Sequence, residues 1–119
     1  MKIVLLLCLL SISFLPTAPA QSDSQMSGEA LVRYETADKA MNVAYQQLLK
    51  VLNEEGKKRL RETQRAWVAY RDAQAGFDSH HFAGGSAEDL ERLGSLELLT
   101  RARTTRLQED ARRFREIYH

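Results

Sequence analysis

Apolar residues recur every three or four positions along three long stretches of the chain, and this spacing predicts three α-helices. The stretches cover residues 27–52, 54–79 and 87–117, whereas residues 21–25 are expected to form a mobile tail. No window alternates polar and β-branched apolar residues as a strand would, and both prolines lie before residue 20. Short connections place consecutive helices side by side in opposite directions. The expected fold is therefore all-α, an up-down-up antiparallel three-helix bundle.

Each predicted helix carries a seam of residues that is expected to face the other two. The first seam consists of Leu31, Tyr34, Asp38, Met41, Tyr45, Leu48 and Leu52. The second consists of Leu60, Trp67, Tyr70 and Phe77, and the third of Leu93, Leu96, Thr100, Arg103, Leu107, Ala111, Phe114 and Tyr118. Asn53 is expected to cap the second helix, and Ser86 to open the third in a capping box with Asp89.

The first twenty residues form a separate segment with the features of a secretory signal peptide. Lys2 supplies the positive start, an apolar run follows, and Ala18-Pro19-Ala20 is a small-residue cleavage signal. Cys8 follows a leucine and lies early, so we interpret it as part of the apolar run rather than as a lipidation site. The chain is therefore expected to be periplasmic or secreted, cleaved after Ala20, with no stable membrane insertion afterwards.

Residues 21–119 form one small domain of balanced charge, because the positive excess of the whole chain, +1, comes from Lys2. This balance and the expected export argue against a nucleic-acid partner. The domain has no cysteine and must be held by packing, as a monomer or weak dimer. The adjacent His80 and His81 cannot both face one metal ion from a regular helix, so neither a metal nor another cofactor is expected.

Polar residues interrupt or border all three seams, and we expect them to contact one another because an unpaired buried charge is costly. They are Asp38 and Asn42, Gln64 and Arg71, and Thr100 and Arg103. Asp38 lies about 21 Å and Arg71 about 25 Å from the turn that joins their helices. These similar heights predict an Asp38–Arg71 ion pair near Thr100 or Arg103, with one acid shared by two arginines as the alternative. No nucleophile paired with a base is indicated, so we interpret the group as a structural layer and do not expect an enzyme.

Four segments of the chain resemble the family of small exported domains named for the lysozyme inhibitor LprI. They are "ADKAMNVAYQQLLKVL" from Ala37, "LRETQRAWVAYRD" from Leu60, "GGS" from Gly84 and "LELLTRARTTRL" from Leu96. The resemblance covers nearly all of residues 21–119. The positions that match the family pattern are Asp38, Asn42, Tyr45, Gln64, Trp67, Arg71, Asp72, Ser86, Thr100 and Arg103.

The chain departs from the family pattern where relatives carry two cysteines, here near Ala75 and at Ser95. The resemblance implies a bridge between the second and third helices that this chain lacks. It also implies binding to a protein, with a lysozyme as the suggested partner and occlusion of its cleft as the mechanism. The alternative is a non-inhibitory envelope interaction or stress protein, or an immunity protein against a toxin. The expected partner-binding loop contains Asp78, His80, His81, Ser86, Glu88 and Asp89.

Overall fold

The computed structural model describes residues 20–118, which form three long helices and one short 3-10 helix. Helix α1 spans Asp23–Val51, α2 spans Glu54–Ser79, η1 spans His80–Phe82 and α3 spans Ser86–Tyr118. The all-α class is confirmed, with no strand in the described part of the chain. The predicted signal peptide, with Cys8, lies outside the described residues except for Ala20.

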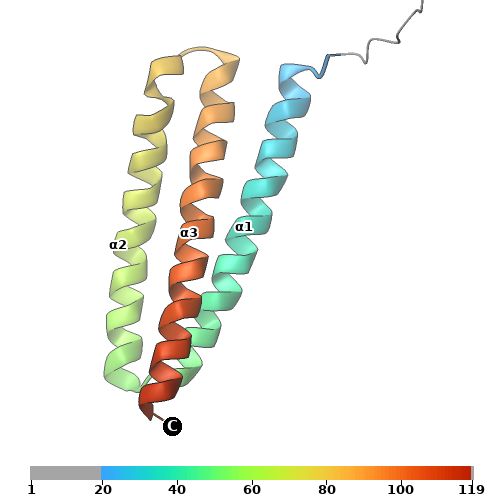
Figure 1. Cartoon of the computed structure of the whole chain (residues 1–119). Coiled ribbons are helices and arrows are strands. Elements are labelled where there is room, and N and C mark those ends of the chain that lie inside the picture. Colours follow the sequence, from blue (N-terminus) through green and yellow to red (C-terminus); the bar gives the residue numbers. More distant parts are fainter. Residues whose placement is uncertain (1–19, 119) are drawn as a thin grey trace, which may run out of the picture.

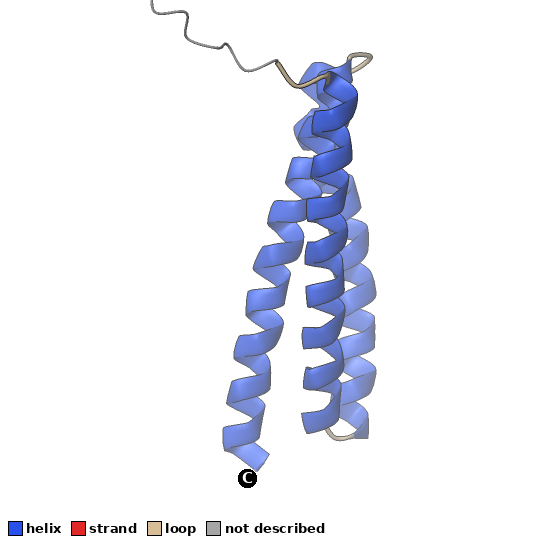
Figure 2. Cartoon of the chain, turned by 90° about the vertical axis from the view of Figure 1, so that its right-hand side faces the viewer, coloured by secondary structure: helices blue, strands red, loops and turns tan. Residues whose placement is uncertain are grey.

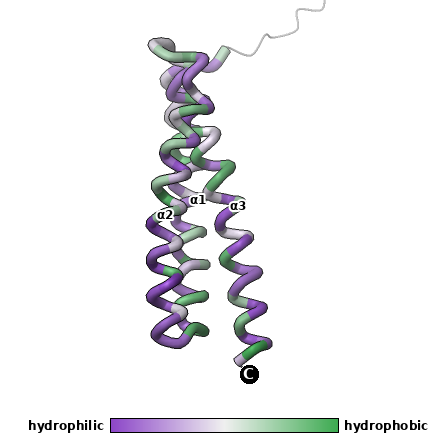
Figure 3. The backbone as a smooth tube through the Cα atoms, turned by 90° about the vertical axis from the view of Figure 1, so that its left-hand side faces the viewer, coloured by the Kyte–Doolittle hydropathy of each residue, from purple (hydrophilic) through white to green (hydrophobic). Residues whose placement is uncertain are grey.

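The three long helices lie side by side and are joined at opposite ends (Figure 1). The turn between α1 and α2 lies at one end, and η1 with the turn after it lies at the other. This path is compatible with the expected up-down-up order. Figures 2 and 3 show α3 diverging from α1 and α2 toward its C-terminal end, so the helices do not pack uniformly along their length.

The helix ends follow local capping chemistry. The Ser22 side chain accepts a hydrogen bond from the backbone N–H of Gln25, whose side chain accepts one from the Ser22 N–H. This capping box starts α1 at Asp23, so the prediction of a tail over residues 21–25 was wrong. Asn53 caps α2 as predicted, with its Oδ1 2.8 Å from the Gly56 nitrogen.

The start of α3 differs from the expected capping box. Ser86 lies inside the helix and donates to the Asp23 carboxylate of α1 at 2.8 Å. The carboxylate that accepts a free backbone N–H is that of Glu88, 2.8 Å from the nitrogen of Gly84. Gly84 has a φ of 82°, a conformation that glycine adopts without steric cost. The turn is therefore closed by Glu88 rather than by a Ser86–Asp89 pair.

The core consists of two buried clusters at different positions along the length of the bundle. The one nearer the α1–α2 turn contains Met41, Ala44, Leu48, Leu60, Leu107 and Ala111. The one nearer η1 contains Ala30, Ala75, Leu93 and Leu96. The alanines leave little side chain between the helices, so backbones approach closely where they lie.

Four large residues that were expected in the seams are exposed: Leu31, Tyr70, Phe77 and Tyr118. In α1 the buried face is turned toward Ala30, Ala37 and Ala44, and in α2 it runs through Arg71, Ala75 and Ser79. The prediction favoured large side chains, although small ones allow the close packing seen here. Within the described residues, no helix is long and apolar enough to cross a membrane.

Candidate functional site

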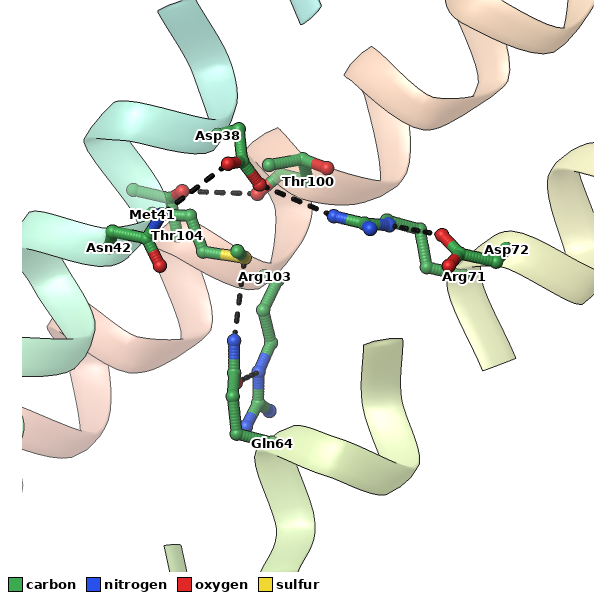
Figure 4. Close-up of polar contacts among 9 residues, drawn as sticks. All are labelled: Asp38, Met41, Asn42, Gln64, Arg71, Asp72, Thr100, Arg103 and Thr104. Carbon is green, nitrogen blue, oxygen red and sulfur yellow. Dashed lines mark hydrogen bonds and ion pairs between the residues drawn. The ribbon is translucent and has the colours of Figure 1, made fainter. Parts of the chain in front are cut away.

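A buried arginine joins α1 to α2 at mid-height. Arg71 is 7% exposed, and its Nη1 lies 3.3 Å from Asp38 Oδ1 while its Nε lies 2.9 Å from Asp72 Oδ1 (Figure 4). The predicted Asp38–Arg71 pair is therefore present. The alternative of one acid between two arginines was wrong, because here one arginine lies between two acids. Both carboxylates are partly exposed, so the Arg71 side chain is the buried member of this group.

Two aromatic rings cover this guanidinium. The Arg71 Cζ lies 5.5 Å from the ring centre of Tyr34 and 5.4 Å from that of Trp67. Arg103 of α3 also approaches Trp67, at 5.8 Å, so the indole contacts two cations. Burial raises the pKa of Tyr34 above its ordinary value, and the nearby Arg71 charge only partly opposes this shift.

Gln64 connects α2 to both other helices. Its Oε1 accepts a hydrogen bond from Arg103 Nε at 3.0 Å, and its Nε2 lies 3.5 Å from the sulfur of Met41. Arg103 thus pairs with an amide and not with Asp38. Burial lowers the pKa of the Arg103 guanidinium. We call Asp38, Gln64, Trp67, Arg71, Asp72 and Arg103 the polar layer.

Three further family positions surround the polar layer. Asn42 donates to Asp38 at 3.4 Å, and Tyr45 is half-buried one turn further along α1. Thr100 is fully buried, and its Oγ1 has no hydrogen-bond partner among the described residues. Its backbone carbonyl accepts a hydrogen bond from the Thr104 hydroxyl at 3.0 Å. Thr100 therefore fills space beneath the polar layer rather than joining it.

A groove of about 520 Å³ runs between α1 and α2 beside the polar layer. Its walls combine Asp38, Asn42, Tyr45, Gln64 and Arg71 with the exposed Arg61 and Arg65. These amide, carboxylate and guanidinium groups can hydrogen-bond a ligand or partner, but they do not resemble a nucleophile activated by a base. In residues 20–118, no group of three or more His, Cys, Asp or Glu side chains is placed to hold a metal ion.

The predicted partner-binding loop is shorter than expected, because Asp78 belongs to α2, His80 and His81 to η1, and Ser86, Glu88 and Asp89 to α3. The structure nevertheless brings all six to one end of the molecule. The two imidazole rings are exposed, with centres 6.0 Å apart.

The acids at this end are held by local contacts. Asp89 pairs with Arg92 at 3.3 Å, and Asp78 accepts hydrogen bonds from Ser95 and Gln74. These two bonds, that of Ser95 first, lower the pKa of the Asp78 carboxyl. These contacts therefore fix the positions of the Asp78 and Asp89 carboxylates.

Charge is divided between the two ends of the molecule, a feature that sequence reasoning missed. The η1 end, residues 20–36 and 69–101, holds nine acidic and four basic side chains, a formal charge of −5. The opposite end, residues 37–68 and 102–118, holds seven acidic and twelve basic side chains, a formal charge of +5. We call these the acidic end and the basic end. The blocks are visible in the sequence, but only the fold brings them together.

Comparisons with known proteins are consistent with the motif resemblance. The family model described as lysozyme inhibitor LprI matches residues 16–107. The uncharacterized protein R02472 of Rhizobium meliloti (strain 1021) is 44% identical over 50 residues, which are 42% of this chain and 36% of that protein. The match thus spans little more than a third of that relative's length. No solved structure matches the chain significantly.

Proposed function

Because the chain belongs to the lysozyme inhibitor LprI family, we propose that it is a non-enzymatic inhibitor that binds a lysozyme. We further propose that it is exported, with residues 1–20 cleaved as a signal peptide and residues 21–119 as the mature domain. The observation that carries the proposal is the acidic end, which has a formal charge of −5 and ends in the exposed residues Phe77, His80, His81 and Phe82. We call these four residues the tip.

The electrostatic part of the proposal is complementarity to a cationic muramidase. Acids gathered at one end of a neutral molecule steer a positively charged partner to that end and orient it. Asp78, Glu88 and Asp89 are tied to neighbours by hydrogen bonds or an ion pair, so little side-chain freedom is lost when they dock.

The tip within the acidic end supplies apolar contact area. Phe77 is 68% and Phe82 44% exposed, and His80 and His81 lie between them in the chain. Exposed aromatic residues ringed by polar ones are typical anchors of protein interfaces. In the proposed complex the tip covers the substrate cleft of the lysozyme, where two carboxylates perform the hydrolysis, and the surrounding acids contact its cationic rim.

The test is a cell-wall lysis assay with the purified domain and lysozymes of several classes. The triple variant Asp78→Asn, Glu88→Gln, Asp89→Asn removes three charges from the acidic end and keeps the side-chain shapes. The matched control, Glu62→Gln, Glu109→Gln, Glu116→Gln, removes three exposed acids from the basic end. We expect the first variant to inhibit about tenfold more weakly or worse, mainly through slower association, and the control to inhibit normally.

Salt provides an independent check, because interactions between exposed charges weaken as ionic strength rises. Inhibition by the unchanged domain should decline from low to high salt, and the acidic-end variant should show a smaller decline. No inhibition of any lysozyme class at a large molar excess would refute the proposal. A pull-down that then returned one stoichiometric toxin would instead support the immunity-protein alternative.

A further inference from the structure

A second cleft, of about 700 Å³, opens at the basic end between α2 and the C-terminal half of α3. Figures 2 and 3 show α3 diverging from the other two helices in this region. The end of α1 and the α1–α2 turn also contribute to its lining. The volume lies within the range typical of small-molecule sites. This cleft is separate from the acidic end and from the groove between α1 and α2.

The walls of the cleft are largely apolar. Leu48 and Leu60 are buried, and Leu52 and Phe114 are half-buried. Phe114 stacks on Tyr118, with ring centres 6.0 Å apart and planes 13° from parallel. A hydrocarbon chain in the cleft would remove these partly exposed surfaces from water.

Among the charged residues that line the cleft, Arg103 alone forms no ion pair, and Asp110 acts on it only from beyond ion-pair distance. Glu55 pairs with Arg59 at 2.9 Å, and Asp110 pairs with Arg106 at 3.2 Å. Asp110 also accepts from Arg113 at 2.9 Å, so it is shared by two arginines. Arg103, by contrast, has no carboxylate within ion-pair distance among the described residues. Its partners are the Gln64 amide and the Trp67 ring.

The Arg103 guanidinium is prepared for an anion. Its Nε donates to Gln64, which fixes the plane of the group, and the Nη atoms carry the other N–H donors. Burial already lowers the pKa of this guanidinium, and an anion beside it would offset the cost of removing its charge from water. Tyr118 lies fifteen positions after Arg103 in α3, which is about 22 Å along the helix.

We propose that this cleft binds a free long-chain carboxylate, with the carboxylate on Arg103 and the hydrocarbon chain along Leu48, Leu60 and Phe114. The cationic group at one end and the apolar walls along the cleft match the two parts of such an amphiphile. The surplus of positive charge at the basic end favours its approach. The proposal goes beyond lysozyme binding and does not depend on it.

The chain supplies its own probe, because Trp67 is its single tryptophan and lies beside Arg103. Titration with monomeric hexadecanoate, below its aggregation concentration, should change Trp67 fluorescence saturably. Hexadecan-1-ol, which lacks the charge, and acetate, which lacks the chain, should bind much more weakly. Vesicles containing anionic phospholipid form a separate arm of the experiment and distinguish a membrane surface from a free amphiphile.

Variants separate the two parts of the site. Arg103→Gln should weaken hexadecanoate binding about ten- to a hundredfold, the usual effect of losing a charged hydrogen-bond donor. Thr63→Phe, which places a ring in the cleft and leaves Arg103 intact, should weaken binding at least as much. The control Arg65→Gln removes an arginine that lines the other groove and should bind normally. Thermal melting establishes that each variant is folded at the titration temperature.

Several results would overturn the proposal. One is the absence of any saturable fluorescence change with hexadecanoate. Others are equal binding of the alcohol, equal weakening by Arg65→Gln and Arg103→Gln, and undiminished binding by Thr63→Phe. A response to anionic vesicles without a response to monomeric hexadecanoate would also exclude a free carboxylate as the ligand.

Discussion

Replacing Asp38 and Asp72 by asparagine, singly and together, measures how the buried Arg71 is compensated. The Arg71 side chain is 8% exposed, whereas the side chains of Asp38 and Asp72 are 37% and 59% exposed. Each single variant leaves one carboxylate in place. Because the exposed carboxylates are screened by water, each single change should cost only about 1 kcal/mol of unfolding free energy.

The double variant removes both carboxylates and leaves Arg71 buried between Tyr34 and Trp67. Breaking a buried pair by removing the partner costs about 3–5 kcal/mol, so the double variant should lose more than the two single variants combined. For a domain of this size, 1 kcal/mol corresponds to a shift in Tm of about 4–8 °C. Thermal and urea unfolding, followed by circular dichroism, gives the free energy of unfolding of the unchanged domain, of the two single variants and of the double variant.

The reasoning would be refuted by a double variant that loses no more unfolding free energy than the two single variants combined. If the double variant melted within about 2 °C of the unchanged domain, Arg71 would not depend on its carboxylates. The aromatic rings would then be its main support. Arg71→Leu provides the complementary measurement, because it removes the buried charge itself and should cost less than the double variant, as an apolar replacement strands no cation.

Three further predictions test individual contacts. Thr100→Val removes a buried hydroxyl with no partner among the described residues and should stabilise the domain by about 1 kcal/mol in urea unfolding. Burial raises the pKa of Tyr34, so its hydroxyl loses its proton at lower pH in the unfolded chain than in the folded one. The contribution of Tyr34 to the free energy of unfolding is therefore fully present below about pH 10 and is lost as pH rises through the folded-state pKa. Urea unfolding at a series of pH values should show this loss in the unchanged domain and not in Tyr34→Phe. Ser95→Ala should raise the pKa of Asp78 toward its ordinary value in an NMR titration.

The helices themselves were predictable because helix formation depends on local spacing and local capping. The second helix was placed at its observed limits, 54–79, and the third within one residue at each end. The first helix was expected to begin four residues late, because the Ser22–Gln25 capping box was overlooked. Such boundaries are decided by a single side chain, which a search for hydrophobic periodicity does not weigh.

The orientation of the helices about their own axes was less predictable. Tyr70 and Phe77 are large and correctly spaced, yet both are exposed, while Ala75 is buried. Burial of a small residue depends on how closely the neighbouring backbone approaches, and that is a property of the whole bundle. The Asp38–Arg71 pair could be found from helix heights alone, but the Gln64–Arg103 contact depends on side-chain rotation.

The two positions where relatives carry cysteines both lie in the acidic end, which is also the proposed lysozyme-binding end. The resemblance implies a bridge between α2 and α3 near Ala75 and Ser95, which lie in the acidic end. Here Ala75 packs with Leu93 and Leu96, and Ser95 donates to Asp78. These noncovalent contacts must resist repulsion among nine acids without a crosslink that constrains the unfolded chain. A cationic partner would reduce the repulsion among these acids. Because such a partner binds the folded acidic end and not the unfolded chain, its binding also stabilises the fold of this end.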